Sequence, residues 1–516
     1  MATVVSSIGL KGMEGYRVQV EVQLLPGVEG ICIVGLPDAS VKESKDRVLA
    51  ALYAYDCEIA DKRIIINLSP AEQKKNSPIF DLAMAIGIMK ETGDIKDPIP
   101  DAAAFLGVLS LDGSIKPVEG MLPAIMAAKK AGYKVLYLPP IHEFPLTHID
   151  GLELRFAETL QDVVESFSGQ MQLNVSPRGA TSRITDLSES ITLTYDKDFK
   201  HVLGHKQAKR ALEIAAAGGH NVLMVGPPGC GKSLLAETFQ SILPPLKQEG
   251  SFDVMSIYQL AGMTNEKHQL PPYRAPHHSA SAVSLIGGGA NPKPGEVTLA
   301  HHGVLFLDEM AEFPKRTLDM LRQPLEMGRV TISRAASTVT YPAQFILIGA
   351  MNPCPCGYLG SRHRYCTCSP KQVLAYTNRV SGPIEDRMDV LLTLNTVALE
   401  QESSEGNEPS SGIRSRVQAA RNIQYARFNR DITNSVVSNE QLSHCSRLND
   451  DQQKMLQQWA SQYHWSTRVQ MKILRLARTI SDLSGHENIS NEAIWEAVTL
   501  RRSNASLGQK RMTADH

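Results

Sequence analysis

The chain has 516 residues, which is too long for a single hydrophobic core and predicts about three domains. Hydrophobic residues make up 42% and charged residues 21% of the sequence, a composition typical of globular proteins. The net charge of −1 excludes a protein that holds nucleic acid by an overall basic field, so any such contact must be local or be repeated by oligomerisation.

The amino-terminal residues lack a basic segment followed by an apolar core, and no apolar run approaches the length of a membrane span. We therefore expect a cytoplasmic protein that makes no contact with a membrane. Four of the eight cysteines are scattered, and the other four lie between Cys354 and Cys368. In a reducing compartment such a cluster favours metal binding over disulfide formation.

Residues 1–171 alternate strand-like and helix-like runs, which predicts an α/β domain with its own core. Tyr16 to Leu25 is strand-like, for example, and Ala39 to Tyr55 is helix-like. Residues 172–198 are polar, contain proline and glycine, and have no regular apolar period, so we expect a linker there.

A complete phosphate-loop pattern, G-x-x-x-x-G-K-S, runs from Gly226 to Ser233. It follows an apolar strand-like run and precedes a helix-like run, which is the context that the motif requires. Backbone amides and the positive end of the helix would face the phosphates, Lys232 would reach the β and γ oxygens, and Ser233 would offer its hydroxyl to Mg²⁺. The alternative is a glycine-rich turn without a ligand. The residues expected to contact the nucleotide are Gly226, Pro227, Pro228, Gly229, Cys230, Gly231, Lys232, Ser233 and Leu234.

A second nucleotide-binding element is predicted between Gly303 and Glu309, where four apolar residues run into two acids. This pattern indicates a buried parallel strand with carboxylates at its carboxyl end, where doubly wound sheets place their chemistry. Asp308 would orient the Mg²⁺ shell, and Glu309 would act as general base toward the attacking water. Because Asp308 follows Lys232 by 76 residues, the two elements together predict a hydrolase that uses ATP and Mg²⁺.

Two further polar residues follow apolar or turn-like segments. Asn352 ends the strand-like run that begins at Phe345, and by itself it would be a turn former before Pro353. Arg387 lies in a segment that begins at Arg379, and its planar, permanent charge suits the transition state of a nucleotide shared between subunits. A solvated surface charge is the alternative interpretation of Arg387.

The cysteine cluster has the spacing C-x-C, nine residues, C-x-C, and consists of Cys354, Cys356, Cys366 and Cys368. Four thiolates can close a tetrahedral structural Zn²⁺ site and stabilise a loop that has little core of its own. Reduced thiols and two disulfides are the alternatives, since the usual pair spacing is C-x-x-C. His363 is a candidate substitute ligand.

The carboxyl-terminal part shows helical periods after an acidic, polar segment from Glu400 to Gly412 that we expect to be a loop. Arg475 and Arg478 are expected on a solvated helix face. The predicted divisions are an α/β ATPase core at 199–398, an all-α lid at 399–503 and a frayed tail at 504–516.

These motifs resemble, in residue type and order, those of magnesium-chelatase-like AAA+ ATPases, in particular the ComM/YifB group. The resemblance runs from near Val4 to about Arg502. It implies an α/β AAA+ P-loop core, a Lon-protease-like domain before it and an all-α lid after it. The segments that carry it most clearly are Tyr273 to His278, Leu305 to Glu309, Asn352 to Gly357 and Ser381 to Arg387.

The resemblance of the front domain to the Lon fold is carried by Ser69 to Gly87 and Gly107 to Gly120. It places Ile79 and Ala124 where a protease would have its serine and lysine, and neither side chain can attack a carbonyl or accept a proton. Ser77 and Lys116 are expected to be turn and surface residues. We therefore expect a catalytically dead domain that serves in binding or assembly.

The resemblance also implies roles for individual residues of the ATPase. Asn352 would be the first sensor, Arg387 the finger that reaches a neighbour's ATP, and Arg468 the second sensor. The adenine would lie beside Val202, Leu203 and Gly204.

Two insertions, Tyr273 to Glu296 and Gly328 to Tyr341, resemble loops that line the pore of related ring ATPases, and the second is expected to form a hairpin. Lys293, Arg329 and Arg334, repeated around a ring, would reconcile the net charge with DNA binding. Local pairing of these cations with acids is the alternative. The pairs His277-His278 and His301-His302 are expected to make structural hydrogen bonds.

The function implied is a homo-hexameric DNA motor or helicase that promotes branch migration when incoming DNA recombines in natural transformation. Its partners would be single-stranded DNA, branched double-stranded DNA and recombination proteins. Two other classes remain open: a magnesium-chelatase-type motor subunit that acts on a protein or porphyrin partner, and an unfoldase component.

Overall fold

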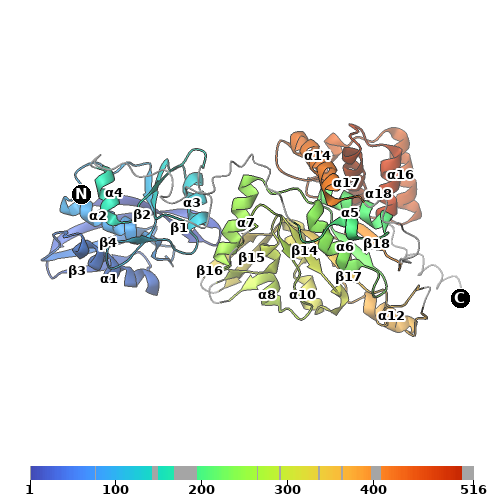
Figure 1. The fold of residues 1–516 in the computed structure, drawn as a ribbon, viewed down its shortest axis with the longest axis horizontal. Coiled ribbons are helices and arrows are strands. Elements are labelled where there is room, and N and C mark those ends of the chain that lie inside the picture. Colours follow the sequence, from blue (N-terminus) through green and yellow to red (C-terminus); the bar gives the residue numbers. More distant parts are fainter. Residues whose placement is uncertain are drawn as a thin grey trace. The chain divides into compact units, whose positions relative to one another are not determined.

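The computed structural model describes residues 2–75, 77–141, 149–167, 195–263, 265, 267–289, 292–334, 337–361, 364–396 and 408–501. The chain divides into two compact units, one of residues 1–192 with 255–264 and one of residues 193–254 with 265–516 (Figure 1). Most of the predicted linker 172–198, most of the predicted loop 400–412 and all of the predicted tail 504–516 lie outside the described residues, as does His363.

The first unit is built on a four-stranded sheet of order β1-β2-β4-β3, in which only the β3–β4 pair is parallel. Along β2, Val18, Val20 and Val22 are buried and the residues between them face outward, as the two-residue period of a strand dictates. The strands are β1 (Thr3–Lys11), β2 (Glu14–Pro26), β3 (Gly30–Val34) and β4 (Lys62–Ser69).

Helices and a second, parallel sheet complete this unit. The sheet has the order β5-β8-β9, and β6 pairs with β7 in a short ribbon. The strands are β5 (Ala103–Phe105), β6 (Val108–Leu109), β7 (Ile115–Lys116), β8 (Val135–Leu138) and β9 (Glu153–Phe156). The helices are α1 (Ala39–Ala54), α2 (Asp81–Thr92), α3 (Met121–Lys130) and α4 (Leu160–Phe167).

The two positions compared with the protease dyad are both in the core. Ile79 is 1% exposed in a 3₁₀ turn, and Ala124 is fully buried in α3. Ser77 caps that turn, because its hydroxyl accepts the backbone N–H of Ile79 (3.4 Å), and Lys116 is exposed. Neither of these last two side chains is brought into the dyad positions as a replacement.

The second unit is built on a five-stranded sheet of order β11-β14-β17-β10-β18, in which every pair is parallel. All carboxyl ends of the strands therefore lie at one edge, the arrangement that places ligands in doubly wound proteins. The strands are β10 (Val222–Val225), β11 (Tyr273–Arg274), β14 (Val304–Leu307), β17 (Ile346–Met351) and β18 (Val390–Thr393).

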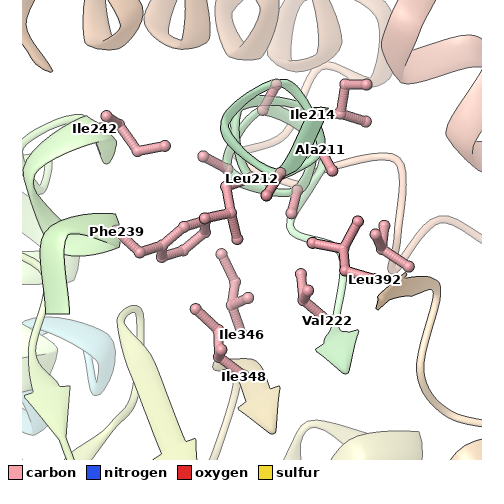
Figure 2. Packing of buried hydrophobic residues seen from close by; sticks show 14 of the residues in the cluster. Ala211, Leu212, Ile214, Val222, Phe239, Ile242, Ile346, Ile348 and Leu392 are labelled. Atoms are coloured by element: carbon pink, nitrogen blue, oxygen red, sulfur yellow. The ribbon is translucent and has the colours of Figure 1, made fainter. Parts of the chain in front are cut away.

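Helix α5 (Lys206–Gly218) packs on this sheet through its apolar face. Figure 2 shows Leu212 of α5 near Phe239, Ile346 and Val222, which come from a neighbouring helix and two strands. Burial of such side chains contributes about 1.5–3 kcal/mol each. The same cluster includes residues of the helical region, so one core supports the sheet and the helices that follow it.

Two antiparallel hairpins project from the second unit: β12 (Gly287–Gly288) with β13 (Lys293–Pro294), and β15 (Arg329–Arg334) with β16 (Ser337–Pro342). They fall in the two predicted insertions. The other helices of the α/β region are α6 (Lys232–Phe239), α7 (Gln248–Leu260, which belongs in part to each unit), α8 (Ala282–Ile286), α9 (Glu296–Leu299), α10 (Lys315–Asp319), α11 (Arg322–Met327), α12 (Pro370–Thr377) and α13 (Gly382–Glu385).

The carboxyl-terminal region is helical, as predicted. Its helices are α14 (Ser410–Phe428), α15 (Asn439–Cys445), α16 (Asp450–Gln462), α17 (Thr467–Leu483) and α18 (Asn491–Arg501). Within the described parts of the chain, no helix is both long and apolar enough to cross a membrane.

The predicted exposure of Arg478 is wrong. Its side chain is fully buried in α17, where it donates to Asp482 (3.1 Å) and to the carbonyls of His486 and Glu487. A guanidinium can be buried when its N–H groups find such acceptors. Arg475 is also partly buried and donates to the Val437 carbonyl (2.8 Å).

Candidate nucleotide site

The phosphate loop leaves the carboxyl end of β10 and enters α6 directly. Gly229 and Gly231 have φ angles of 75° and 86°, in the left-handed region that glycine adopts without strain. Gly231 is the N-cap of α6, and no side chain caps the helix there. The first amides of α6 are therefore available to an anion at the positive end of the helix.

Lys232 lies within the curve of this loop. Its Nζ donates to the carbonyls of Gly226 (2.7 Å) and Pro227 (2.9 Å) and to Asn352 Oδ1 (3.2 Å). Burial lowers the pKa of Lys232, while Cys230 and the nearby carboxylates act in the opposite direction. The ammonium thus stands among neutral acceptors that a polyphosphate can replace.

Ser233 and Asp308 meet across the sheet edge. The hydroxyl of Ser233 donates to Asp308 Oδ2 at 2.9 Å, and Asp308 Oδ1 accepts the backbone N–H of Glu309 (2.9 Å). A hydroxyl and a carboxylate side by side are the hard oxygen ligands that Mg²⁺ takes beside a nucleotide. Together with the uncapped helix, this donor set fits ATP and Mg²⁺.

Glu309 follows the β14 strand in a left-handed conformation with φ of 47°. Its Oε2 lies 3.2 Å from His278 Nδ1, and the ring of His278 packs against that of His277 at an angle of 35°, with centroids 4.0 Å apart. His277 bonds Ser279 (2.8 Å between Nδ1 and Oγ). The contact between His278 and Glu309 was not foreseen, because His278 follows β11, whose place beside β14 is a property of the sheet rather than of the local sequence.

Asn352 lies at the carboxyl end of β17 and faces Lys232, as described above. Burial raises the pKa of Tyr376, which is 5% exposed at the end of α12, and the backbone N–H of Asn352 acts in the opposite direction. Val202 is packed in the core and Leu203 is 39% exposed, so of these two predicted base contacts only Leu203 presents its side chain to the surface. Gly204 turns the chain with φ of 63°.

Arg387 and Arg468 converge on one carboxylate, that of Glu326. Arg387 Nη2 donates to Glu326 Oε2 (2.5 Å), and Arg468 Nη2 lies 3.5 Å from Oε1. Arg387 precedes the amino-terminal end of β18, whereas the phosphate loop follows the carboxyl end of β10, its parallel neighbour. The two arginines therefore stand at the opposite sheet edge from the phosphate loop of their own chain, and Glu326 was not identified from the sequence.

The four cysteines of the cluster come together. All four Sγ atoms lie within 4.8 Å of one another, and Cys354 Sγ is 3.3 Å from Cys356 Sγ and 3.6 Å from Cys366 Sγ. Backbone N–H groups, that of Tyr358 foremost, lower the pKa of the Cys356 thiol to about 6. A tetrahedral zinc with Zn–S bonds of about 2.3 Å separates its sulfurs by about 3.8 Å, so this donor set fits Zn²⁺.

The remaining residues singled out from the sequence are the cations of the two hairpins and the pair His301-His302. Lys293 and Arg329 are exposed on the two hairpins, and the side chain of Arg334 lies outside the described set. His301 and His302 have a third neighbour, Asp253, that the sequence did not reveal. His301 Nδ1 accepts the backbone N–H of Gln344 (3.1 Å), so the other nitrogen of a neutral ring carries the proton and offers no lone pair to a metal.

Comparison with known proteins follows the same divisions of the chain. A family model described as magnesium chelatase, subunit ChlI, matches residues 198–402. Models described as subunit ChlI of Mg-chelatase and as its C-terminal region match residues 20–141 and 407–501.

Individual proteins extend the similarity to nearly the whole chain. Competence protein ComM of Haemophilus influenzae is 37% identical over 503 residues, which cover 96% of this chain and 97% of that protein. YifB of Salmonella typhimurium is 36% identical over 496 residues, or 95% of each chain. Lon protease 2 of Bacillus subtilis is 34% identical over 125 residues, or 24% of this chain and 22% of the protease.

Proposed function

The chain belongs to the magnesium-chelatase-like AAA+ family that includes ComM and YifB, and from this premise we propose that it is a Mg²⁺-dependent ATP hydrolase that works as a ring-shaped DNA motor. The observation that carries the ATPase assignment is the convergence of Lys232, Ser233, Asp308 and Asn352 at the carboxyl edge of one parallel sheet. Lys232 and Ser233 begin the helix that follows β10 and the phosphate loop, and Asp308 and Asn352 follow β14 and β17, so the carboxyl ends of three neighbouring strands supply the site, as phosphoryl transfer requires.

Each of these residues has a distinct role in the proposal. The amides of the phosphate loop and Lys232 bind the phosphates, and Ser233 and Asp308 hold Mg²⁺, which neutralises charge on the β and γ oxygens. Glu309 takes a proton from the attacking water, and Asn352 orients that water. The Lys232–Asn352 hydrogen bond holds these two side chains next to each other before nucleotide binds.

The position of Arg387 supports assembly of several copies of the chain into a ring. Because Arg387 and Arg468 lie at the other edge of the sheet, they are poorly placed to reach phosphates in their own chain and well placed to complete the site of a neighbour. Their shared partner, Glu326, would then release them as a neighbour's nucleotide arrives. We propose a homo-hexamer, a closed ring in which head-to-tail contacts place such an arginine pair beside every site.

The proposal that DNA is the substrate rests on the similarity to ComM and on two hairpins. The relative ComM is named a competence protein, and the exposed cations Lys293 and Arg329 lie on the hairpins that resemble pore loops. We propose that the ring moves on single-stranded and branched double-stranded DNA and promotes branch migration in natural transformation, beside recombination proteins. The front domain, with Ile79 and Ala124 buried, serves as a binding module without proteolysis, and the cysteine cluster holds a structural zinc.

The test is ATP hydrolysis by the full chain with and without branched DNA. We expect hydrolysis that DNA stimulates, abolition by Lys232→Ala, and a loss of about 10²–10⁴-fold in kcat for Glu309→Gln with ATP still bound. Hydrolysis without stimulation and without salt-sensitive DNA binding would favour a chelatase-type motor instead. No hydrolysis by the wild-type chain would refute the ATPase assignment itself.

A further inference from the structure

A long segment of the second unit is free of acidic residues. From Met327 to Ile384 the sequence contains no aspartate or glutamate, in a chain that has 54 of them in 516 residues. The same segment contains six arginines and lysines: Arg329, Arg334, Arg362, Arg364, Lys371 and Arg379. A neutral chain can thus present a local basic surface, which is the electrostatic requirement for binding a phosphate backbone.

Part of this segment carries an aromatic residue that the fold does not use. Tyr365 is 97% exposed, at the end of the loop between Cys356 and Cys366. A single exposed ring needs no ligand by itself, but beside exposed cations it offers a flat apolar face that a ligand with both rings and negative charges can use. The flat face of a tyrosine stacks on nucleobases, with a preference for unpaired ones.

The cation beside Tyr365 is held in position. The guanidinium of Arg364 lies over the ring of Tyr358, 5.2 Å from its centroid, and donates to the Tyr358 hydroxyl at 3.0 Å. Arg364 remains exposed, so its other N–H groups are open to a phosphate. Lys371 on α12 is exposed too, whereas Arg379 is engaged by Glu312 (2.7 Å).

The sulfurs of Cys354, Cys356, Cys366 and Cys368 lie within 4.8 Å of one another, so Arg364 and Tyr365 directly precede a point at which the chain returns to Cys354. Helix α12 follows directly and begins at a complete capping box on Ser369. Figure 1 shows α12 at the periphery of the second unit.

We propose that the described residues of the cysteine loop, 354–361 and 364–368, and α12 form a binding surface for single-stranded nucleic acid, with Tyr365 stacking on a base and Arg364 and Lys371 contacting phosphates. This surface is additional to the two hairpins and deepens the DNA motor proposed above, on which it rests. The exposed apolar side chains of this surface are Tyr365, Leu359 and Leu374, and they share it with the exposed cations Arg364 and Lys371. Because this stretch of sequence contains no aspartate or glutamate, its charge favours a polyanion over a protein partner.

The surface is joined to the nucleotide site at two points. Gly357, with φ of 83°, lies so close to the phosphate loop that a Cβ in its place would come within 2.7 Å of the Pro228 ring. At the other end of the segment, the buried Tyr376 of α12 lies close enough to Asn352 for the backbone N–H of Asn352 to act on the pKa of Tyr376. A strand bound at Tyr365 and Lys371 would therefore act close to two residues, Gly357 and Tyr376, that lie beside Pro228 and Asn352, which provides a route for stimulation of hydrolysis by DNA.

The experiment measures binding of a fluorescent oligo-dT of about 20 nucleotides to the full chain by anisotropy over a series of salt concentrations. Tyr365→Ala should weaken binding about 5- to 100-fold, because one base loses its stacking partner, and Tyr365→Phe should retain it. Arg364→Ala should reduce the slope of log affinity against log salt by about 0.7, the value for one phosphate contact to a single strand.

Arg430→Ala removes an exposed arginine of the helical region and is the matched control, expected to bind as the wild type does. The thermal midpoint of each variant establishes that it is folded. If the wild type binds oligo-dT and Tyr365→Ala binds it equally well, this surface is overturned and the DNA motor stands. The same holds if Tyr365→Phe binds as weakly as Tyr365→Ala. Absence of oligo-dT binding by the wild type overturns the surface, and absence of branched-DNA binding as well overturns the motor.

Discussion

At the scale of single residues, a buried ion pair joins the helical region to the α/β sheet. Lys472 Nζ of α17 lies 2.7 Å from Asp389 Oδ1, and the other carboxylate oxygen accepts the backbone N–H of Asn221 (3.0 Å). Burial raises the pKa of Asp389, but Lys472 and His220 outweigh it, so the net pKa lies below the ordinary value. Asp389 directly precedes β18, so this pair also positions the segment that carries Arg387.

We expect Lys472→Met to lower the free energy of unfolding of the helical region by about 3–5 kcal/mol, because it leaves the Asp389 carboxylate buried without its partner. All three tryptophans, Trp459, Trp465 and Trp495, lie in this region, so their fluorescence during urea unfolding reports it selectively. Lys454→Met, at an exposed position of α16, is the control. Equal urea midpoints for the two variants would show that the pair does not stabilise the region.

The same pair sets a pH dependence. The pKa of Asp389 is lowered in the folded chain, so its stabilising effect is complete above the unfolded value of about 3.9 and is lost as the pH falls through the folded value. Acid unfolding of Asp389→Asn should accordingly be less steep below pH of about 4 than that of the wild type. A parallel pair of acid unfolding curves would contradict this.

The surroundings of a single residue could be predicted from the sequence only where residues close to it in the chain determine them. The strands that bring Ser233 to Asp308 are four-residue apolar runs, and the glycine pattern of the phosphate loop needs no distant contact. Arg478 was misassigned because its acceptors follow in the next turn and loop, and a helical period does not show them. Glu326, and Glu309 as the partner of His278, were not predicted because these contacts join residues far apart in the sequence.

At the scale of elements, the cysteine loop is the segment in which the proposed zinc would lie. It has little apolar core, and Cys354 is its only cysteine that is fully buried. The hairpin β15–β16 was predictable from its β-branched runs, whereas α12 was not identified, since its capping box follows the cysteines without a long apolar period. A sequence pattern locates elements that have their own apolar periodicity. Helix α12 has no long period of this kind and is held instead by Tyr376 and its cap.

We expect metal analysis of the purified chain to find about one zinc per chain, and Cys366→Ser to lose most of it and lower the thermal midpoint, because three thiolates hold the ion less tightly. Cys445→Ser removes a cysteine outside the cluster and should leave zinc content unchanged. A wild-type chain with far less than one zinc would leave the sulfurs as reduced thiols and end the proposal of a structural metal.

At the scale of the whole molecule, the predicted α/β AAA+ core, Lon-like front domain and helical carboxyl-terminal region are confirmed by the sheet order, by the family models and by the similarity to Lon protease 2. Assembly could be inferred from the sequence only by resemblance, because no local pattern says on which sheet edge an arginine will stand. The parallel pairing of β10 with β18 supplies that information, since it separates Arg387 from its own phosphate loop by the length of a strand.

This separation makes a specific prediction for mixed assemblies. Lys232→Ala and Arg387→Ala should each abolish hydrolysis alone, the first by loss of phosphate binding and the second with ATP still bound. In a ring assembled from equal amounts of both, a site is complete where the phosphate loop of an Arg387→Ala chain meets the arginine of a Lys232→Ala chain, so the mixture should regain about a quarter of the wild-type rate. A Lys232→Ala, Arg387→Ala double variant mixed with either single variant is the control, because it can form no complete site with it. A finger acting within its own chain would leave the first mixture as inactive as its components.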